Sequence, residues 1–127
     1  MKLIVYNKII EEKIMKFDIN KVKIMVTVPV ENANEVRNAM CEAGAGVIGN
    51  YTHCSMSTSV IGTFKPTEDA NPYIGKANEL EFVNEDKVDV ICDVKLVKQV
   101  IRKLREVHPY EEPAIDIVPL IDEDCFE

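Results

Sequence analysis

The chain has 127 residues, 46% of them hydrophobic, so a single domain can bury an apolar core without disulfide bonds or a structural metal. Asp and Glu (22) outnumber Lys and Arg (15), and the net charge of −7 makes nucleic acid an unfavourable partner. The sequence has neither an apolar run of membrane-spanning length nor a signal-peptide pattern, so we expect a cytoplasmic protein without a membrane partner.

The first twenty residues are ambiguous. Residues 3–6 are apolar enough for a strand, and residues 8–17 form a weak helical pattern. We therefore expect residues 1–20 to be an N-terminal arm or an element that caps a sheet edge.

A strand and a helix follow this arm. Residues 21–30 alternate apolar and polar side chains, which is typical of a half-buried strand. Asn32 is positioned as a helix N-cap, with Glu35 as its capping-box partner three residues later. Gly44 is a natural end for this helix.

The middle of the chain predicts two or three short strands and a loop. Residues 45–54 predict a turn into a second strand, and residues 55–63 its extension into a hairpin arm. Prolines and glycine between residues 66 and 75 predict an exposed loop. Residues 79–83 and 87–92 predict two further strands, separated by a polar break.

A second helix and a last strand complete the pattern. Asp93 is the predicted N-cap, an apolar stripe follows at helical spacing, and Pro109 ends the helix. Residues 114–120 predict the final strand, before an acidic tail at residues 122–127. The order β-α-β-β-α-β over residues 21–121 predicts an α+β, ferredoxin-like sandwich with an extra hairpin or loop.

Several motifs resemble those of a known family. They lie at residues 42–51, 53–55, 62–66, 70–75 and 108–114, the last reading His-Pro-Tyr-Glu-Glu-Pro-Ala. Together they resemble the PII-like domain that is inserted into many Nif-three-like (NGG-interacting factor three) proteins, here as a chain of its own. The His-Pro-Tyr-Glu segment is also similar to the end of CutA divalent-cation tolerance proteins.

The resemblance covers residues 22–120, with departures at three positions. Met56 stands where the family favours an aromatic residue, Val60 where it favours glycine, and Ile115 where it favours tyrosine. The resemblance implies a PII/CutA-like fold that assembles as a homotrimer, with a divalent metal ion of the zinc or copper type or a small ligand as its partner. The two-metal centre of Nif-three-like proteins needs several histidines, and this sequence has only His53 and His108.

The segment at residues 108–113 is the main candidate metal site. Pro109 and Pro113 restrict the backbone around His108, Glu111 and Glu112, whose imidazole and carboxylates are suitable metal ligands. The alternative is that the segment only ends the helix and directs the chain into the last strand.

His53 and Cys54 are the second candidate pair of metal ligands. Neighbouring residues of a strand point to opposite faces, so the favoured interpretation is a surface histidine beside a buried cysteine. If either residue joins His108 in one site, we expect this across a subunit boundary.

Two functions remain open at this stage. The first is a trimeric binding or regulatory module with a metal ion or small ligand near residues 108–113. The second is a structural, oligomerisation or protein-interaction module without a ligand of its own. An enzyme is not expected, because no third group that could orient a Cys54–His pair is recognisable.

Overall fold

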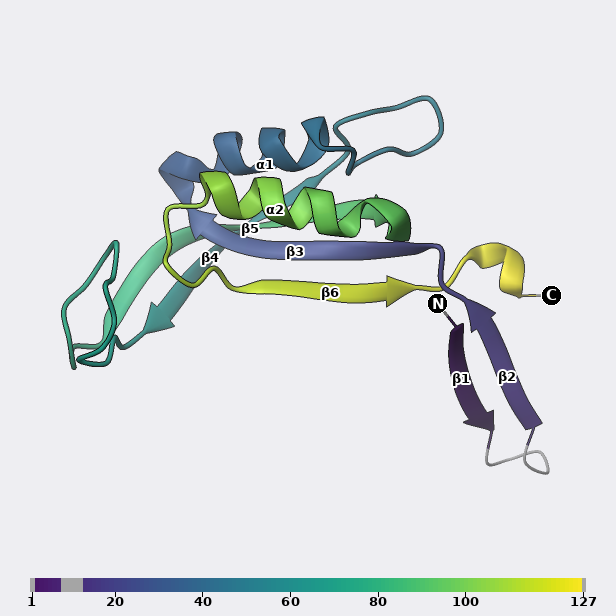
Figure 1. Cartoon of the computed structure of the whole chain (residues 1–127), viewed down its shortest axis with the longest axis horizontal. Coiled ribbons are helices and arrows are strands. Elements are labelled where there is room, and N and C mark those ends of the chain that lie inside the picture. The colour runs from purple at the N-terminus through teal and green to yellow at the C-terminus, as the bar shows by residue number, and fades with distance from the viewer. Residues whose placement is uncertain (1, 8–12, 127) are drawn as a thin grey trace.

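The computed structural model describes residues 2–7 and 13–126. Its main sheet contains β3 (Lys21–Pro29), β4 (Met56–Phe64), β5 (Glu81–Asp93) and β6 (Ile115–Leu120), in the spatial order β4-β5-β3-β6. All neighbouring strands are antiparallel, and the two helices lie on one face of the sheet (Figure 1). This arrangement confirms the predicted α+β, ferredoxin-like fold and its β-α-β-β-α-β order.

The two helices are α1 (Ala33–Glu42) and α2 (Val97–Val107), each preceded by one short 3-10 turn, η1 (Val30–Asn32) or η2 (Val94–Leu96). Their apolar faces cover the buried side chains of the central strands. The core includes Val22, Ile24, Val26 and Val28 of β3, Val88, Val90 and Cys92 of β5, Val36 and Met40 of α1, and Val100 and Leu104 of α2. Among the described residues, none of the helices is long and apolar enough to cross a membrane.

The two strands predicted at residues 79–83 and 87–92 form one continuous strand, β5. Its polar middle segment, residues 84–86, pairs with β4 at Val60 and its neighbours. The same segment also pairs with the end of β3, where Pro29 lies opposite Glu85. Strand pairing on both sides outweighs the low strand propensity of Asn and Asp, so the predicted break does not form.

The strand predicted within residues 45–54 is absent from the structure. Gly46, Gly49 and His53 have positive φ angles of 78°, 56° and 58°, which are incompatible with an extended strand. Gly46 lies so close to the returning chain that a Cβ atom would approach the carbonyl oxygen of Cys54 to 2.8 Å. The segment is a compact loop, and the strand begins only at Met56.

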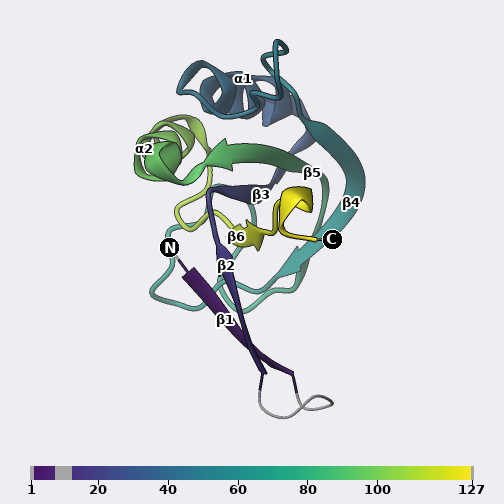
Figure 2. The same ribbon diagram turned by 90° about the vertical axis from the view of Figure 1, so that its right-hand side faces the viewer.

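The N-terminal segment contains a separate hairpin of β1 (Lys2–Asn7) and β2 (Lys13–Asp18), which projects away from the main sheet (Figures 1 and 2). The predicted strand at residues 3–6 is confirmed. The predicted helix at residues 8–17 is wrong for residues 13–17, which belong to β2, and residues 8–12 lie outside the described residues. Phe17 at the end of β2 is buried, and its ring centroid lies 6.1 Å from that of Phe126.

Of the two predicted N-cap residues, Asp93 makes a side-chain cap hydrogen bond and Asn32 does not. Asp93 accepts a 2.8 Å hydrogen bond from the backbone N–H of Lys95, so this cap is confirmed. Asn32 does occupy the N-cap position of α1, but its side chain makes no cap hydrogen bond and its Oδ1 is buried without a described partner. The η1 turn just before α1 replaces the predicted capping box with Glu35.

Candidate ligand-binding site

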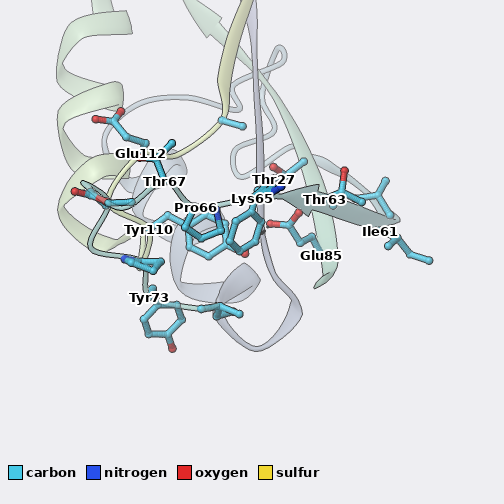
Figure 3. Close-up of a pocket in the computed structure, with 18 residues that line it drawn as sticks. Thr27, Ile61, Thr63, Lys65, Pro66, Thr67, Tyr73, Glu85, Tyr110 and Glu112 are labelled. Carbon is cyan, nitrogen blue, oxygen red and sulfur yellow. Dashed lines mark hydrogen bonds between the residues drawn. The ribbon is translucent and has the colours of Figure 1, made fainter. Parts of the chain in front are cut away.

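A pocket of about 580 Å³ lies at the end of the sheet where β3 ends and the chain passes from α2 to β6. Its walls come from the second half of β4, the loop at residues 65–80, and the turn at residues 110–114 (Figure 3). Thr27 of β3 and Glu85 of β5 complete the lining from the central strands. This volume lies within the range of small-molecule pockets.

The loop at residues 65–80 is held by backbone hydrogen bonds. The N–H of Asn78 donates to the carbonyl oxygen of Pro66 at 2.7 Å, which closes the base of the loop. The N–H of Asn71 donates to Oε2 of Glu111 at 3.0 Å, which joins the loop to the turn on the other side of the pocket. The two pocket walls are therefore tied together.

Aromatic side chains line the space between the loop and the turn. The ring centroid of Tyr110 lies 6.2 Å from that of Phe64 and 6.3 Å from that of Tyr73, within the usual range for aromatic pairs. Tyr73 is 55% exposed and lies at the rim, with its hydroxyl group pointing away from the other labelled side chains (Figure 3).

Glu85 is a buried carboxylate in this pocket, with only 5% of its surface exposed. Its Oε2 accepts a 2.9 Å hydrogen bond from the hydroxyl group of Tyr110. Gly62 on β4 leaves the space that this carboxylate occupies, because a Cβ atom there would collide with Oε1 of Glu85. Burial, followed by the bond to the Glu85 carboxylate, raises the pKa of the Tyr110 phenol, which therefore stays protonated and donates.

His108 lies behind the pocket and is 6% exposed. Its Nε2 is 2.8 Å from the carbonyl oxygen of Thr27, and its Nδ1 accepts the N–H of Tyr110 at 3.1 Å. The Nδ1 contact requires the tautomer with the proton on Nε2, which donates to Thr27. Burial lowers the pKa of the imidazole more than the Thr27 bond and the nearby Glu85 raise it.

The sequence-predicted metal ligands are not assembled within one chain. Both nitrogens of His108 are engaged within the protein, while Glu111 and Glu112 are exposed at the pocket edge. The loop that carries His53 and Cys54 lies at the opposite end of the sheet (Figure 1). Residues 2–7 and 13–126 contain no group of three or more His, Cys, Asp or Glu side chains that could hold a metal ion.

The structure agrees with part of the prediction made for His53 and Cys54. His53 is exposed, as predicted, and its Nδ1 lies 3.1 Å from Oγ1 of Thr52. Cys54 is only half-buried, and its Sγ is 3.9 Å from the carbonyl oxygen of Thr52. Cys41 and Cys92 are buried, and burial raises the pKa of both thiols, so neither has the character of a nucleophile.

Sequence reasoning missed the polar centre of the pocket. The predicted break between two strands contains Glu85, which in the structure is the buried carboxylate of the site. A glycine inside a strand pattern often marks the close approach of another group, so Gly62 was the available signal. Tyr110 belongs to the motif at residues 108–114. Its hydrogen-bond partner, Glu85, lies 25 residues earlier in the chain, and no local pattern indicates that the two residues meet.

Known proteins share both the sequence and the fold of this chain. A GTP cyclohydrolase 1 type 2 homolog of Halalkalibacterium halodurans is 46% identical over 101 residues, covering 80% of this chain and 27% of that protein. The homolog from Bacillus subtilis is 45% identical over 98 residues, covering 77% and 26%. A Bacillus cereus protein related to NIF3 superposes with a TM-score of 0.72 at 41% identity, over 82% of this chain and 26% of the other.

The chain therefore resembles the PII/CutA-like domain of Nif-three-like proteins. It spans about a quarter of the length of the curated relatives that it matches. CutA from Synechococcus elongatus has the same fold as this PII/CutA-like domain, with a TM-score of 0.62 at 17% identity over 83% of this chain and 80% of that one. No family model matches the chain.

Proposed function

We propose that this PII/CutA-like domain is a binding or regulatory module that takes a small ligand in the pocket beside Tyr110 and works as a cytoplasmic homotrimer. The observation that carries the proposal is a concave, largely apolar pocket with a buried, hydrogen-bonded carboxylate, Glu85, in its lining. Such pockets, with few polar groups in fixed positions, are typical of small-molecule sites.

The pocket walls support binding because they are held before a ligand arrives. Three hydrogen bonds fix the turn after α2: His108 to Thr27, Tyr110 to Glu85, and Asn71 to Glu111. A ligand would therefore meet a turn and a loop that are already held by hydrogen bonds within the chain. Preorganisation of this kind reduces the entropy lost on binding.

The exposed apolar side chains near one end of the sheet support self-association. Ile61 on β4 is 69% exposed and Phe82 on β5 is 66% exposed, in the segment where these two strands pair. The outer edges of β4 and β6 pair with no other strand of the described chain. Free edges and exposed apolar residues favour pairing with other copies.

The relatives are named GTP cyclohydrolase 1 type 2 homologs, but this chain matches only about a quarter of their length. We place the activity in that name outside the matched segment. The pocket lining offers three carboxylates, two tyrosine phenols and the ammonium group of Lys65, and both nitrogens of His108 are bonded within the chain. This residue set supports binding better than catalysis.

A divalent metal ion is the second candidate ligand. Structural neighbours of this chain include a divalent ion tolerance protein CutA1 from Ehrlichia chaffeensis, with a TM-score of 0.59 at 19% identity. Exposed His53 with Cys54 of one copy, and Glu111 with Glu112 of another, would be the ligands of a site formed between subunits. A module that only assembles and takes no ligand is the remaining alternative.

The proposal is tested by measuring mass and ligand-dependent stability on the same protein. We expect light scattering to give about three times the 14.4 kDa of one chain, and Ile61→Lys with Phe82→Lys to lower that mass. A thermal-shift panel of divalent ions, nucleotides and small organic amines should raise the melting temperature with at least one member.

Site-directed variants separate the outcomes. Glu85→Gln should abolish the shift caused by a pocket ligand, whereas Glu35→Gln on the exposed side of α1 is the matched control and should retain it. Loss of a metal-induced shift in His53→Ala with Cys54→Ser would support the second candidate. A trimer that responds to no member of the panel would contradict the binding role and leave the assembly role.

A further inference from the structure

The Glu85 carboxylate lacks a positively charged partner in the described protein. Its Oε2 accepts the bond from Tyr110, while its Oε1 accepts no hydrogen bond from the described residues. The ion pair found in the described part of the chain, Lys103 with Glu106, lies elsewhere on α2. Glu85 is 5% exposed and lines the pocket with one carboxylate oxygen unpaired within the described residues, so this position is suited to a positive group from outside the chain.

The charges around the pocket have the same sign as Glu85. The acidic and basic side chains of its lining are three carboxylates, on Glu85, Glu111 and Glu112, against one ammonium group on Lys65. One oxygen of Glu111 is already used by the backbone N–H of Asn71. The net negative pocket on a chain of charge −7 attracts cations and repels anions.

The remaining walls suit an organic cation better than a bare metal ion. Phe64, Tyr73 and Tyr110 present aromatic rings, and Pro66 and Pro72 add apolar surface. Aromatic faces attract ammonium and guanidinium groups as well as apolar chains. A metal ion would need several oxygen, nitrogen or sulfur ligands converging on one point, and no such group is present in the described residues.

We infer that this pocket binds a small organic cation whose ammonium or guanidinium group pairs with Glu85 while its apolar part lies against Phe64 and Tyr73. The inference rests on the proposed binding function and names the chemical class of the ligand. Oε1 of Glu85 accepts from the ligand cation, and the Tyr110 hydroxyl group holds the carboxylate in place through Oε2. Nucleotides and other anions are excluded by the same carboxylates.

The charge requirement is tested with three probes of similar shape. These are 2-phenylethylamine as the cation, 2-phenylethanol as the neutral analogue and 3-phenylpropionate as the anion, titrated against the full chain by ligand-observed NMR at low ionic strength. We expect the cation to bind at least about tenfold more tightly than the neutral probe, as a charge-assisted hydrogen bond predicts, and the anion to bind most weakly. Equal binding of cation and neutral probe, or preference for the anion, overturns the inference.

Variants locate the probe and separate this inference from the binding function itself. Glu85→Gln keeps the side-chain shape and should reduce the affinity for the cation about tenfold without changing that for the neutral probe. Tyr73→Ala should weaken both probes, and exposed Glu79→Gln, outside the pocket lining, is the control that should change neither. The comparison of probes on the unaltered chain remains decisive if Glu85→Gln fails to fold.

The outcomes for the two proposals are distinct. A cation that binds equally well to Glu85→Gln, or does not bind the unaltered chain at all, overturns the inference. A nucleotide or metal ion that stabilises the chain in the same experiments would overturn the inference and support the binding function. The binding function fails only when none of these classes stabilises the protein.

Discussion

The hydroxyl group of Tyr110 donates a 2.9 Å hydrogen bond to the buried carboxylate of Glu85. This bond joins the turn after α2 to the middle of β5, two segments that are 25 residues apart in the sequence. It also places a protonated phenol beside the negative charge at the pocket, because burial and the carboxylate raise the pKa of Tyr110. The turn and the pocket are therefore one structural unit.

Removal of this hydroxyl group should destabilise the fold. In Tyr110→Phe the ring remains, but Oε2 of Glu85 loses its donor while staying buried. We expect the free energy of unfolding to fall by about 1–3 kcal/mol, the typical penalty for a buried polar group left unsatisfied. Urea denaturation followed by circular dichroism measures the change.

The matched control is Tyr73→Phe. Tyr73 packs near Tyr110 and is more than half exposed, and the described structure records no hydrogen bond from its hydroxyl group. We expect its free energy of unfolding to stay within about 0.5 kcal/mol of the original value. Equal losses in the two variants would mean that the Glu85 bond contributes nothing specific.

The fold was largely predictable because its signals are local. The alternation along β3 and the apolar stripe of α2 each arise from residues next to one another in sequence, and both elements occur where predicted. The failure to predict one continuous β5 has a non-local cause. Residues 84–86 are extended because β3 and β4 pair with them, and no local pattern reports those partners.

The candidate site was only half predictable for the same reason. The motif at residues 108–113 identified the turn that lines the pocket, but not the direction of each side chain. His108 bonds to Thr27, 81 residues away, and so faces the sheet instead of a ligand. The buried state of Glu85 depends on the close approach of β4 at Gly62, which appears only in three dimensions.

His108 should make stability depend on pH. Burial lowers its pKa in the folded state below the ordinary value of 6.5, so the unfolded chain takes up a proton first. The neutral His108 side chain contributes its full stabilisation at pH values above the pKa of histidine in the unfolded chain, about 6.5. This contribution is lost as the pH falls from there toward the lower pKa of His108 in the folded chain. Protonation of Nδ1 would also remove the acceptor of the Tyr110 N–H.

The check is a series of urea midpoints between about pH 8 and pH 5. The unaltered chain should lose stability on acidification, and His108→Gln should start from a lower value and lose less over this range. His53→Gln, at the exposed histidine, should follow the unaltered chain. A His108→Gln curve parallel to that of the unaltered chain would assign the pH dependence to the carboxylates.

Gly62→Ala tests how closely β4 approaches the pocket carboxylate. The added Cβ would collide with Oε1 of Glu85, so the carboxylate has to shift, and this shift disturbs the bond of its Oε2 to Tyr110. We expect a loss of about 1–3 kcal/mol in the free energy of unfolding, as for other overpacked sites. The variant Ser59→Ala, at an exposed position of the same strand, is the control, and a comparable loss there would point to β4 pairing instead of the collision.

The two helix caps provide a paired prediction that needs no ligand. Asp93→Ala removes the acceptor of the Lys95 N–H and should reduce the free energy of unfolding by about 0.5–2 kcal/mol. Asn32→Ala should cost less, because the Asn32 side chain makes no cap hydrogen bond and its Oδ1 is buried without a described partner. Removal of an unsatisfied buried oxygen offsets the loss of packing. Chemical denaturation of both variants decides the order, and a larger loss in Asn32→Ala would mean that this side chain caps α1 in solution after all.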